Sequence, residues 1–189
     1  GDWMVGSDSI LDDNLATNWS YYMVLNKNQA KANDFAPFGT PTSSTFTIGN
    51  SNRVNNNGND YVAYVWCNIP GVCKIGWYQG TGSATDAPFI YTGFKPALVI
   101  IKRTDTANDW NMQDIVRSPF NVMDGEVLQA NSESSEANVG TGYQRDHLSN
   151  GFRLRSTGTE TNGSGGTYIY MAWSAEGLSN QYGGISNAQ

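Results

Sequence analysis

Residues 168–173 read Tyr-Ile-Tyr-Met-Ala-Trp, and residues 61–66, which lie 107 positions earlier, read Tyr-Val-Ala-Tyr-Val-Trp. Both segments are apolar on each of the two faces that a strand presents, a pattern typical of a strand covered on both sides. A structural unit that is written twice explains the repeated pattern. The sequence therefore predicts that residues 61–66 and 168–173 are equivalent central strands in two copies of one β-rich unit.

The tryptophans support the same duplication. Trp occurs only six times, yet the interval from Trp3 to Trp66 is the same as the interval from Trp110 to Trp173. The neighbouring residues agree, because an Asp precedes the first Trp of each pair and a Gly lies at the same distance before the second. Duplicated units usually build scaffolds and binding surfaces, whereas an active site seldom needs two copies.

The offset also places the boundary between the copies. An apolar run at residues 97–103 precedes the Asp-Trp pair of the second copy, and the first copy has no such run because the sequence starts at its own Asp-Trp pair. We therefore expect residues 1–87 to be the first copy without its N-terminal strand. Residues 88–189 are then the second copy, beginning with the strands of residues 88–103. We also expect the chain to be the C-terminal portion of a longer protein.

The composition favours short strands and tight turns. Aromatic residues make up 12% of the 189 residues, charged residues make up 15%, and Gly occurs 21 times. Aromatic side chains suit pleated sheets, and Gly suits turns with positive φ. No segment carries a helix-period apolar stripe over three turns. The predicted fold class is all-β, an antiparallel β-sandwich-like architecture built from the duplicated unit, with at most one or two short helices.

The charge and hydropathy of the chain argue against two classes of partner. The formal charge is −6 and the pI is near 4.6, with 11 scattered basic residues. A phosphate-binding surface needs clustered Lys and Arg, so we expect no nucleic-acid partner. The sequence has no apolar run long enough to cross a bilayer and no basic-then-apolar N-terminal segment, so we expect no membrane insertion and no signal peptide.

Cys67 and Cys73 flank a five-residue segment that contains the turn signal Pro-Gly. The turn predicts a hairpin in which the two thiols face each other, so a disulfide is one interpretation. The other is two small apolar side chains in a core. The second is favoured, because one Cys pair gives little evidence for an oxidising compartment.

Candidate catalytic groups are few. His147 follows an Asp, and such a pair is compatible with a Ser-His-Asp triad. The sequence lacks a Gly-x-Ser-x-Gly nucleophile motif, so a structural His is favoured. One His and one Cys pair fall short of the three or four ligands of a zinc site. Acid pairs such as Asp12 with Asp13, or Glu133 with Glu136, are expected to be solvated surface groups rather than glycosidase carboxylates.

The oxygen-rich residues 105–109 resemble a short calcium loop in composition, but they lack the full ligand spacing, and a plain β-turn is favoured. The sequence therefore predicts no catalytic residue, no cofactor and no metal site.

Residues 76–82 form the best candidate contact surface, with Trp77, Tyr78 and Gln79 as a glycan contact. An exposed aromatic ring stacks on a sugar, while neighbouring amides hydrogen-bond the hydroxyls. Adjacent residues of a strand point to opposite faces, so one of the two rings is expected in the core and the other at the surface. The alternative, which is favoured, is that both rings fill the core or a subunit interface.

Longer segments resemble a known group of proteins. They are Tyr-Thr-Gly-Phe-Lys-Pro-Ala-Leu-Val at residues 91–99, Leu-Ser-Asn-Gly-Phe-Arg-Leu-Arg at 148–155 and Gly-Gly-Thr-Tyr-Ile-Tyr-Met-Ala at 165–172, together with residues 61–64, 74–82 and 117–119. The chain resembles, over nearly its whole length, the uncharacterised β-rich repeats toward the C-terminal ends of structural and tail-fibre-type proteins of marine phages, notably cyanophages. Members often have Phe where this chain has Trp66 and Trp173, and other residues at Cys67.

The resemblance implies a non-enzymatic structural domain of a virion appendage, such as a tail fibre, made in the host cytoplasm and assembled into the virion. It implies a homotrimer, contacts with other virion proteins and contact with a host surface glycan. It brings no known catalytic residues. Two alternatives stay open: a free carbohydrate-binding, lectin-like module, if an aromatic lies exposed in a groove, and a polysaccharide depolymerase, if two carboxylates converge in a deep cleft.

Overall fold

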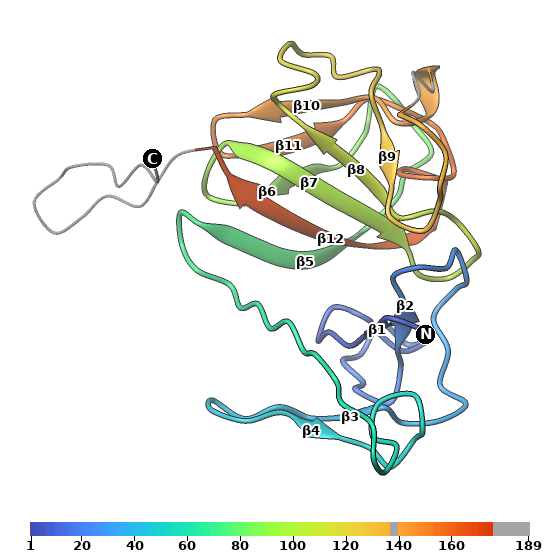
Figure 1. Ribbon diagram of the computed structural model, residues 1–189. Coiled ribbons are helices and arrows are strands. Elements are labelled where there is room, and N and C mark those ends of the chain that lie inside the picture. Colours follow the sequence, from blue (N-terminus) through green and yellow to red (C-terminus); the bar gives the residue numbers. More distant parts are fainter. Residues whose placement is uncertain (137–139, 176–189) are drawn as a thin grey trace, which may run out of the picture.

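The computed structural model describes residues 1–136 and 140–175. Two antiparallel sheets pack face to face in the larger part of the molecule, as Figure 1 shows. The larger sheet has the strand order β5-β12-β7-β8-β9, with β5 (Cys73–Gln79), β12 (Thr167–Ser174), β7 (Pro96–Arg103), β8 (Asn111–Asp114) and β9 (Leu128–Gln129). The smaller sheet has the order β10-β11-β6, with β10 (Arg145–Leu148), β11 (Gly151–Leu154) and β6 (Phe89–Tyr91).

The remaining strands form two short ribbons near the N-terminus. They are β1 (Met4–Val5) with β2 (Met23–Val24), and β3 (Phe38–Gly39) with β4 (Thr47–Ile48). The helical structure of residues 1–136 and 140–175 is limited to the 3-10 turn η1 (Gly140–Gly142). The predicted all-β, antiparallel, sandwich-like fold is confirmed.

The main core lies between the two sheets. β12 is the central strand of the larger sheet, paired with β5 on one side and β7 on the other. Its inward residues Tyr168, Tyr170 and Ala172 are buried against residues of β6, β7 and β11. The Tyr168 ring also stacks on Tyr78 of β5, with ring centroids 5.0 Å apart. The central-strand prediction for residues 168–173 is therefore correct, because both faces of this strand are covered.

A second core lies on the opposite face of the larger sheet, where the N-terminal part of the chain packs (Figure 1). Ile10 and Met23 of that part join Ile169 of β12 around Trp110, which is 1% exposed. The Trp110 indole N–H donates to the Val24 carbonyl at 2.9 Å. One tryptophan thus ties the N-terminal part to the sheet by packing and by a hydrogen bond.

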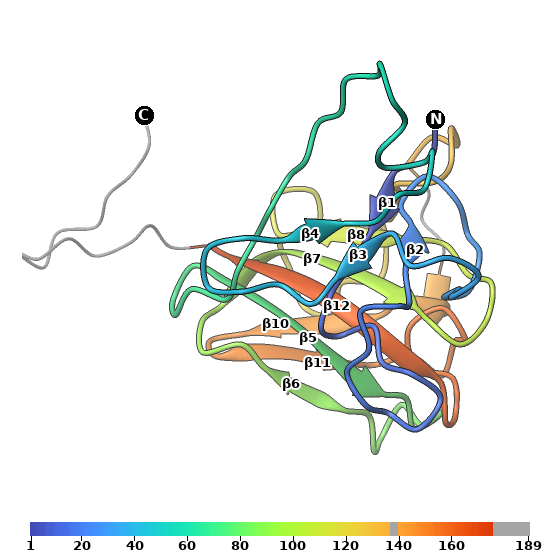
Figure 2. The same ribbon diagram turned by 90° about the horizontal axis from the view of Figure 1, so that it is seen from below.

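The central-strand prediction for residues 61–66 is wrong. These residues are extended but belong to no sheet, and they run from the N-terminal part up to β5 as the long connection in Figure 1. Figure 2 shows the same connection from below, beside the β3–β4 ribbon. Trp66 is 52% exposed, whereas Trp173 lies partly buried in β12. The apolar pattern is the same in both segments, but only residues 168–173 have neighbouring strands.

The duplication and the boundary at residue 87 stay predictions. β5 lies in the range assigned to the first copy, yet it pairs with β12, which lies in the second. One local feature is common to both ranges: Gly58 and Gly165 both have positive φ, +82° and +70°, a conformation that glycine adopts without a steric penalty. Residues 176–189, at the end of the second range, lie outside the described residues.

Candidate functional site

The structure separates the three residues of the predicted glycan contact. Trp77 points outward from the edge strand β5 and is 42% exposed, and Gln79 is also exposed. Tyr78 points into the main core, is 7% exposed, and donates its hydroxyl to the Thr161 carbonyl at 2.7 Å. Burial raises the pKa of Tyr78 well above its usual value. Tyr78 is therefore not available to a ligand, and the candidate contact is reduced to Trp77 and Gln79.

The loop that follows β5 is hydrogen-bonded to the loop before β12. Asn162 is fully buried; its side-chain oxygen accepts from the Thr81 backbone N–H at 2.9 Å, and its amide donates to the Ser83 carbonyl at 2.9 Å. Gly80 and Gly166 also share a backbone hydrogen bond of 2.8 Å. Hydrogen bonds therefore join the loop after β5 to the Gly-rich loop before β12 at this end of the sandwich.

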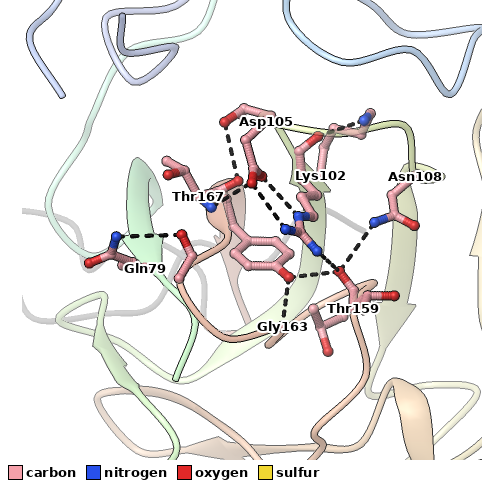
Figure 3. Close-up of polar contacts among 12 residues, drawn as sticks. Gln79, Lys102, Asp105, Asn108, Thr159, Gly163 and Thr167 are labelled. Atoms are coloured by element: carbon pink, nitrogen blue, oxygen red, sulfur yellow. Dashed lines mark hydrogen bonds and ion pairs between the residues drawn. The ribbon is translucent and has the colours of Figure 1, made fainter. Parts of the chain in front are cut away.

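A polar network holds the second of these loops (Figure 3). The Tyr168 hydroxyl donates to the Thr159 carbonyl at 2.7 Å and accepts from the Gly163 N–H at 2.8 Å. The Arg103 guanidinium binds Asp105 through two hydrogen bonds of 2.8 and 3.0 Å and reaches the Thr159 carbonyl at 3.4 Å. Desolvation raises the pKa of Asp105, but the pairing with Arg103 outweighs it, and the net shift is downward.

In residues 105–109, which resemble a calcium loop in composition, both carboxylates are already paired with other side chains. Asp105 is engaged by Arg103, and Asp109 accepts from Gln129 and Asn131 at 2.9 and 2.7 Å. Over residues 1–136 and 140–175, no group of three or more His, Cys, Asp or Glu is placed to hold a metal ion.

His147 lies inside the sandwich, not at the surface. It is 3% exposed, and its Nδ1 lies 2.9 Å from the Pro96 carbonyl, which requires the proton on Nδ1. The neighbouring Asp146 points to the other face of β10, where Arg155 binds its carboxylate at 2.5 Å. Burial and the nearby Arg145 guanidinium lower the pKa of His147 to about 3. His147 and Asp146 therefore do not form the pair that a triad requires.

Asp12, Asp13 and Glu136, from the two acidic pairs, make hydrogen bonds or ion pairs with other groups of the protein. Asp12 accepts backbone N–H groups from residues 14 and 16 at 2.9 Å each, and Asp13 forms an ion pair with Lys31 at 3.0 Å. Glu136 binds Arg117 at 2.9 Å. These carboxylates stabilise turns and strand connections.

Both cysteines are free thiols. Cys73 is buried and donates its Sγ–H to the Cys67 carbonyl at 2.8 Å, while Cys67 is exposed. The predicted turn is present, with Gly71 at φ +77°, but Cys73 pairs with Ile69 across it instead of with Cys67.

Sequence reasoning missed a shallow depression of about 310 Å³ between the N-terminal part and the β3–β4 ribbon. Its lining is neutral: Thr17, Asn18, Trp19, Ser20, Phe38, Gly39 and Thr40. The Asn18 side chain accepts from the Ser20 N–H at 3.0 Å, an Asx-turn that positions Trp19 between them. Phe38 lies on the bare backbone of Gly6, where a Cβ would come within 2.5 Å of the ring. The Asn-Trp-Ser segment could have indicated the turn at Trp19. The sequence does not indicate that Phe38 lines the same depression, because the two residues are far apart along the chain.

A third exposed surface is the segment of residues 61–66. Its large apolar side chains are 47–69% exposed, and the Tyr64 ring stacks between Trp3 and Trp66, at centroid distances of 6.2 and 6.0 Å. Contiguous exposed apolar patches of this kind often mark interaction sites in proteins.

The chain matches a protein-family model over most of its length. A family model with the description "Domain of unknown function (DUF7483)" matches residues 2–177. No curated protein and no solved structure matches the chain. In the part of the chain that the structure describes, no helix has the length and apolar character needed to span a bilayer.

Proposed function

The chain belongs to the DUF7483 family, whose function is unknown, and we propose that it is a non-enzymatic structural domain of a phage virion appendage, such as a tail fibre, that contacts the host cell surface. In this role it assembles with further copies of itself and with other virion proteins. It reaches its place in the virion after synthesis in the host cytoplasm.

The observation that carries the proposal is the position in the fold of the three longest segments that resemble phage structural proteins. Residues 91–99 form the end of β6, the turn after it and the first half of β7. Residues 148–155 form the last residue of β10, the turn after it and β11, and residues 165–172 form most of β12. These elements supply most of the main core. The longest segments of the resemblance to phage structural proteins therefore coincide with elements of the main core, and this supports a structural role for the domain.

We expect the purified chain to be a homotrimer, with three times the 20.6 kDa mass of one chain in light scattering. Phe46 and Ile48 at the β3–β4 ribbon are 45% and 41% exposed, and a subunit contact would cover them. Ile48→Lys should dissociate the trimer, whereas Val116→Lys, at an 86% exposed position away from this ribbon, should not. A monomer at micromolar concentration would contradict the trimer.

A second candidate function, a carbohydrate-binding module, is favoured by the neutral depression at Trp19 and Phe38. Two aromatic rings surrounded by hydroxyl and amide groups suit a neutral sugar, because the rings cover its C–H face while the polar groups reach its hydroxyls. The Ser20 and Thr40 hydroxyls make no hydrogen bond to any described residue, so both are available to a ligand. Trp77 and Gln79 offer a second, more open contact.

In a glycan array and a host-cell binding assay, we expect Trp19→Ala to weaken binding about tenfold, through lost stacking of about 1–1.5 kcal/mol. Trp77→Ala should have a smaller effect, and Phe120→Ala, at an 82% exposed position elsewhere, serves as the matched control. Several linked copies raise the avidity of a weak site, so the assay should use the assembled protein. Binding that is unchanged in both tryptophan variants would leave the domain with an architectural role only.

A further inference from the structure

The dipeptide Asn-Gly occurs three times in the sequence, at residues 57–58, 150–151 and 162–163. In this dipeptide the asparagine side chain reacts readily with the backbone, because glycine has no Cβ to hinder the approach of its own backbone nitrogen. The structure places the three pairs in different surroundings, and these surroundings decide which pair can react in the folded protein.

The pair at residues 57–58 is open. Asn57 and Gly58 are exposed and occupy the two central positions of a turn, in the loop between β4 and the long connection to β5 (Figure 1). One hydrogen bond of 3.2 Å, from the Asn59 N–H to the Asn56 carbonyl, closes this turn. Gly58 has φ +82°, and a Cβ built on it would meet no atom within 4 Å.

Both reacting groups of this pair are free. Neither the Asn57 side-chain amide nor the Gly58 N–H makes a hydrogen bond to any residue that the structure describes. The backbone between the two groups can therefore rotate at the loss of the single hydrogen bond that closes the turn.

The pair at residues 162–163 is held at both groups. Asn162 is fully buried, and its amide donates to the carbonyls of Ser83 and Ser156 at 2.9 and 2.7 Å. The Gly163 N–H donates to the Tyr168 hydroxyl at 2.8 Å. A reaction between Asn162 and Gly163 has to break all three hydrogen bonds inside the protein.

The pair at residues 150–151 is held at its glycine. Asn150 is exposed, but Gly151 is buried at the start of β11, where it lies between Leu148 of β10 and Tyr91 of β6. The contact is close, because a Cβ on Gly151 would come within 2.2 Å of the Ile90 carbonyl oxygen. The backbone of Gly151 therefore cannot rotate unless the three-stranded sheet opens.

We propose that Asn57 is a site of spontaneous deamidation in the folded protein. The Gly58 backbone nitrogen attacks Cγ of Asn57 and forms a bond to it, while the bond from Cγ to Nδ2 breaks. The proton of the Gly58 N–H leaves with Nδ2 as ammonia, and a succinimide ring remains. Water then adds to one of the two ring carbonyl carbons and breaks its bond to the Gly58 nitrogen, which regains a proton. Opening at Cγ gives aspartate, and opening at the backbone carbonyl gives isoaspartate.

The reaction changes the charge and the backbone beside an exposed surface. Either product adds a negative charge near the exposed Asp60, and isoaspartate also lengthens the backbone by a carbon atom. The turn leads into the open segment, residues 61–66, whose large apolar side chains are exposed. The two are linked, because the Tyr61 hydroxyl accepts from the Asn56 N–H at 2.9 Å and donates to the Asn52 carbonyl at 3.0 Å.

Mass spectrometry of tryptic peptides, after incubation of the folded chain at mildly alkaline pH, tests the proposal. Trypsin places the three Asn-Gly pairs on separate peptides, residues 54–74, 146–153 and 156–189. We expect the mass gain of amide-to-carboxyl conversion to appear in peptide 54–74 at least about tenfold faster than in the other two, because the held pairs react only after local unfolding. Labelling with an isoaspartyl methyltransferase should mark the same peptide.

Two variants and an unfolded sample complete the test. Asn57→Gln should remove the reaction from peptide 54–74, because the longer side chain has to close a larger ring. Asn59→Gln, at an exposed asparagine of the same turn that no glycine follows, should leave it unchanged. In concentrated urea the three pairs should react at similar rates. Equal rates in the folded chain, a reaction in peptide 54–74 that Asn57→Gln leaves in place, or no reaction there while the unfolded chain reacts would each overturn the proposal.

Discussion

Replacing Trp110 with alanine is expected to lower the free energy of unfolding by about 3–5 kcal/mol, the range for truncating a fully buried aromatic side chain. Trp110 is 1% exposed and packs against Ile10, Met23 and Ile169, so the substitution leaves a cavity where the N-terminal part meets the larger sheet. It also leaves the Val24 carbonyl without its indole donor. Urea unfolding, followed by far-UV circular dichroism, measures the loss.

Trp66→Ala is the matched control, because it deletes the same side chain from the 52% exposed position in the open segment. The expected change in unfolding free energy is below about 0.5 kcal/mol, as for most surface substitutions. This differs from what the sequence repeat predicts, which is a core position for both Trp66 and Trp173. Comparable losses in Trp110→Ala and Trp66→Ala would mean that residues 61–66 are packed in solution and would contradict the open segment.

The sequence predicted strands where the pattern is local. The alternation of β5 separates Trp77 from Tyr78, and the doubly apolar pattern of residues 168–173 correctly indicates a strand covered on both faces. The same pattern at residues 61–66 was misleading. Burial depends on whether two other strands lie beside a segment, and this is a property of the whole chain rather than of six residues.

The candidate sites were predictable to a smaller degree. Trp77 and Gln79 are exposed as the contact interpretation requires, but the depression at Trp19 and Phe38 joins residues that are well separated in the sequence and lie on different segments. The burial of His147 could not be predicted from the sequence either. Its neighbour Asp146 suggested a catalytic pair, yet adjacent residues of a strand face opposite ways, so the two cannot act together.

The second large effect is a loss of stability in mild acid that depends on His147. In the folded chain burial is the largest cause that lowers the pKa of His147, followed by Arg145; Lys95 acts in the same direction, and the Pro96 carbonyl and Asp114 oppose it. The net result is a folded-state pKa of about 3, against an unfolded value of about 6.5. The folded protein therefore holds His147 neutral over a range in which the unfolded chain binds a proton.

The direction of the change in stability with pH follows from the difference in proton binding between the folded and unfolded states. Above pH 6.5 His147 is neutral in both states and has no effect on the pH dependence of stability. Between pH 6.5 and pH 3 only the unfolded chain is protonated, so each unit of acidification stabilises the unfolded state by about 1.4 kcal/mol. Acidification from pH 7.5 to pH 4 should lower the free energy of unfolding by about 3 kcal/mol through this residue. Below pH 3 the contribution levels off, because both states are protonated.

His147→Asn separates this effect from the carboxylates that also titrate in acid. The asparagine amide can donate to the Pro96 carbonyl, as Nδ1 does at 2.9 Å, but it does not titrate. Urea unfolding at a series of pH values should give two curves that converge as the pH falls from 7.5 to 4, because only the unsubstituted chain loses the histidine contribution. The carboxylates are the same in both chains and cancel in the difference. Parallel curves would mean that His147 is protonated in the folded state, and therefore that the interior of the sandwich beside Arg145 is accessible to water.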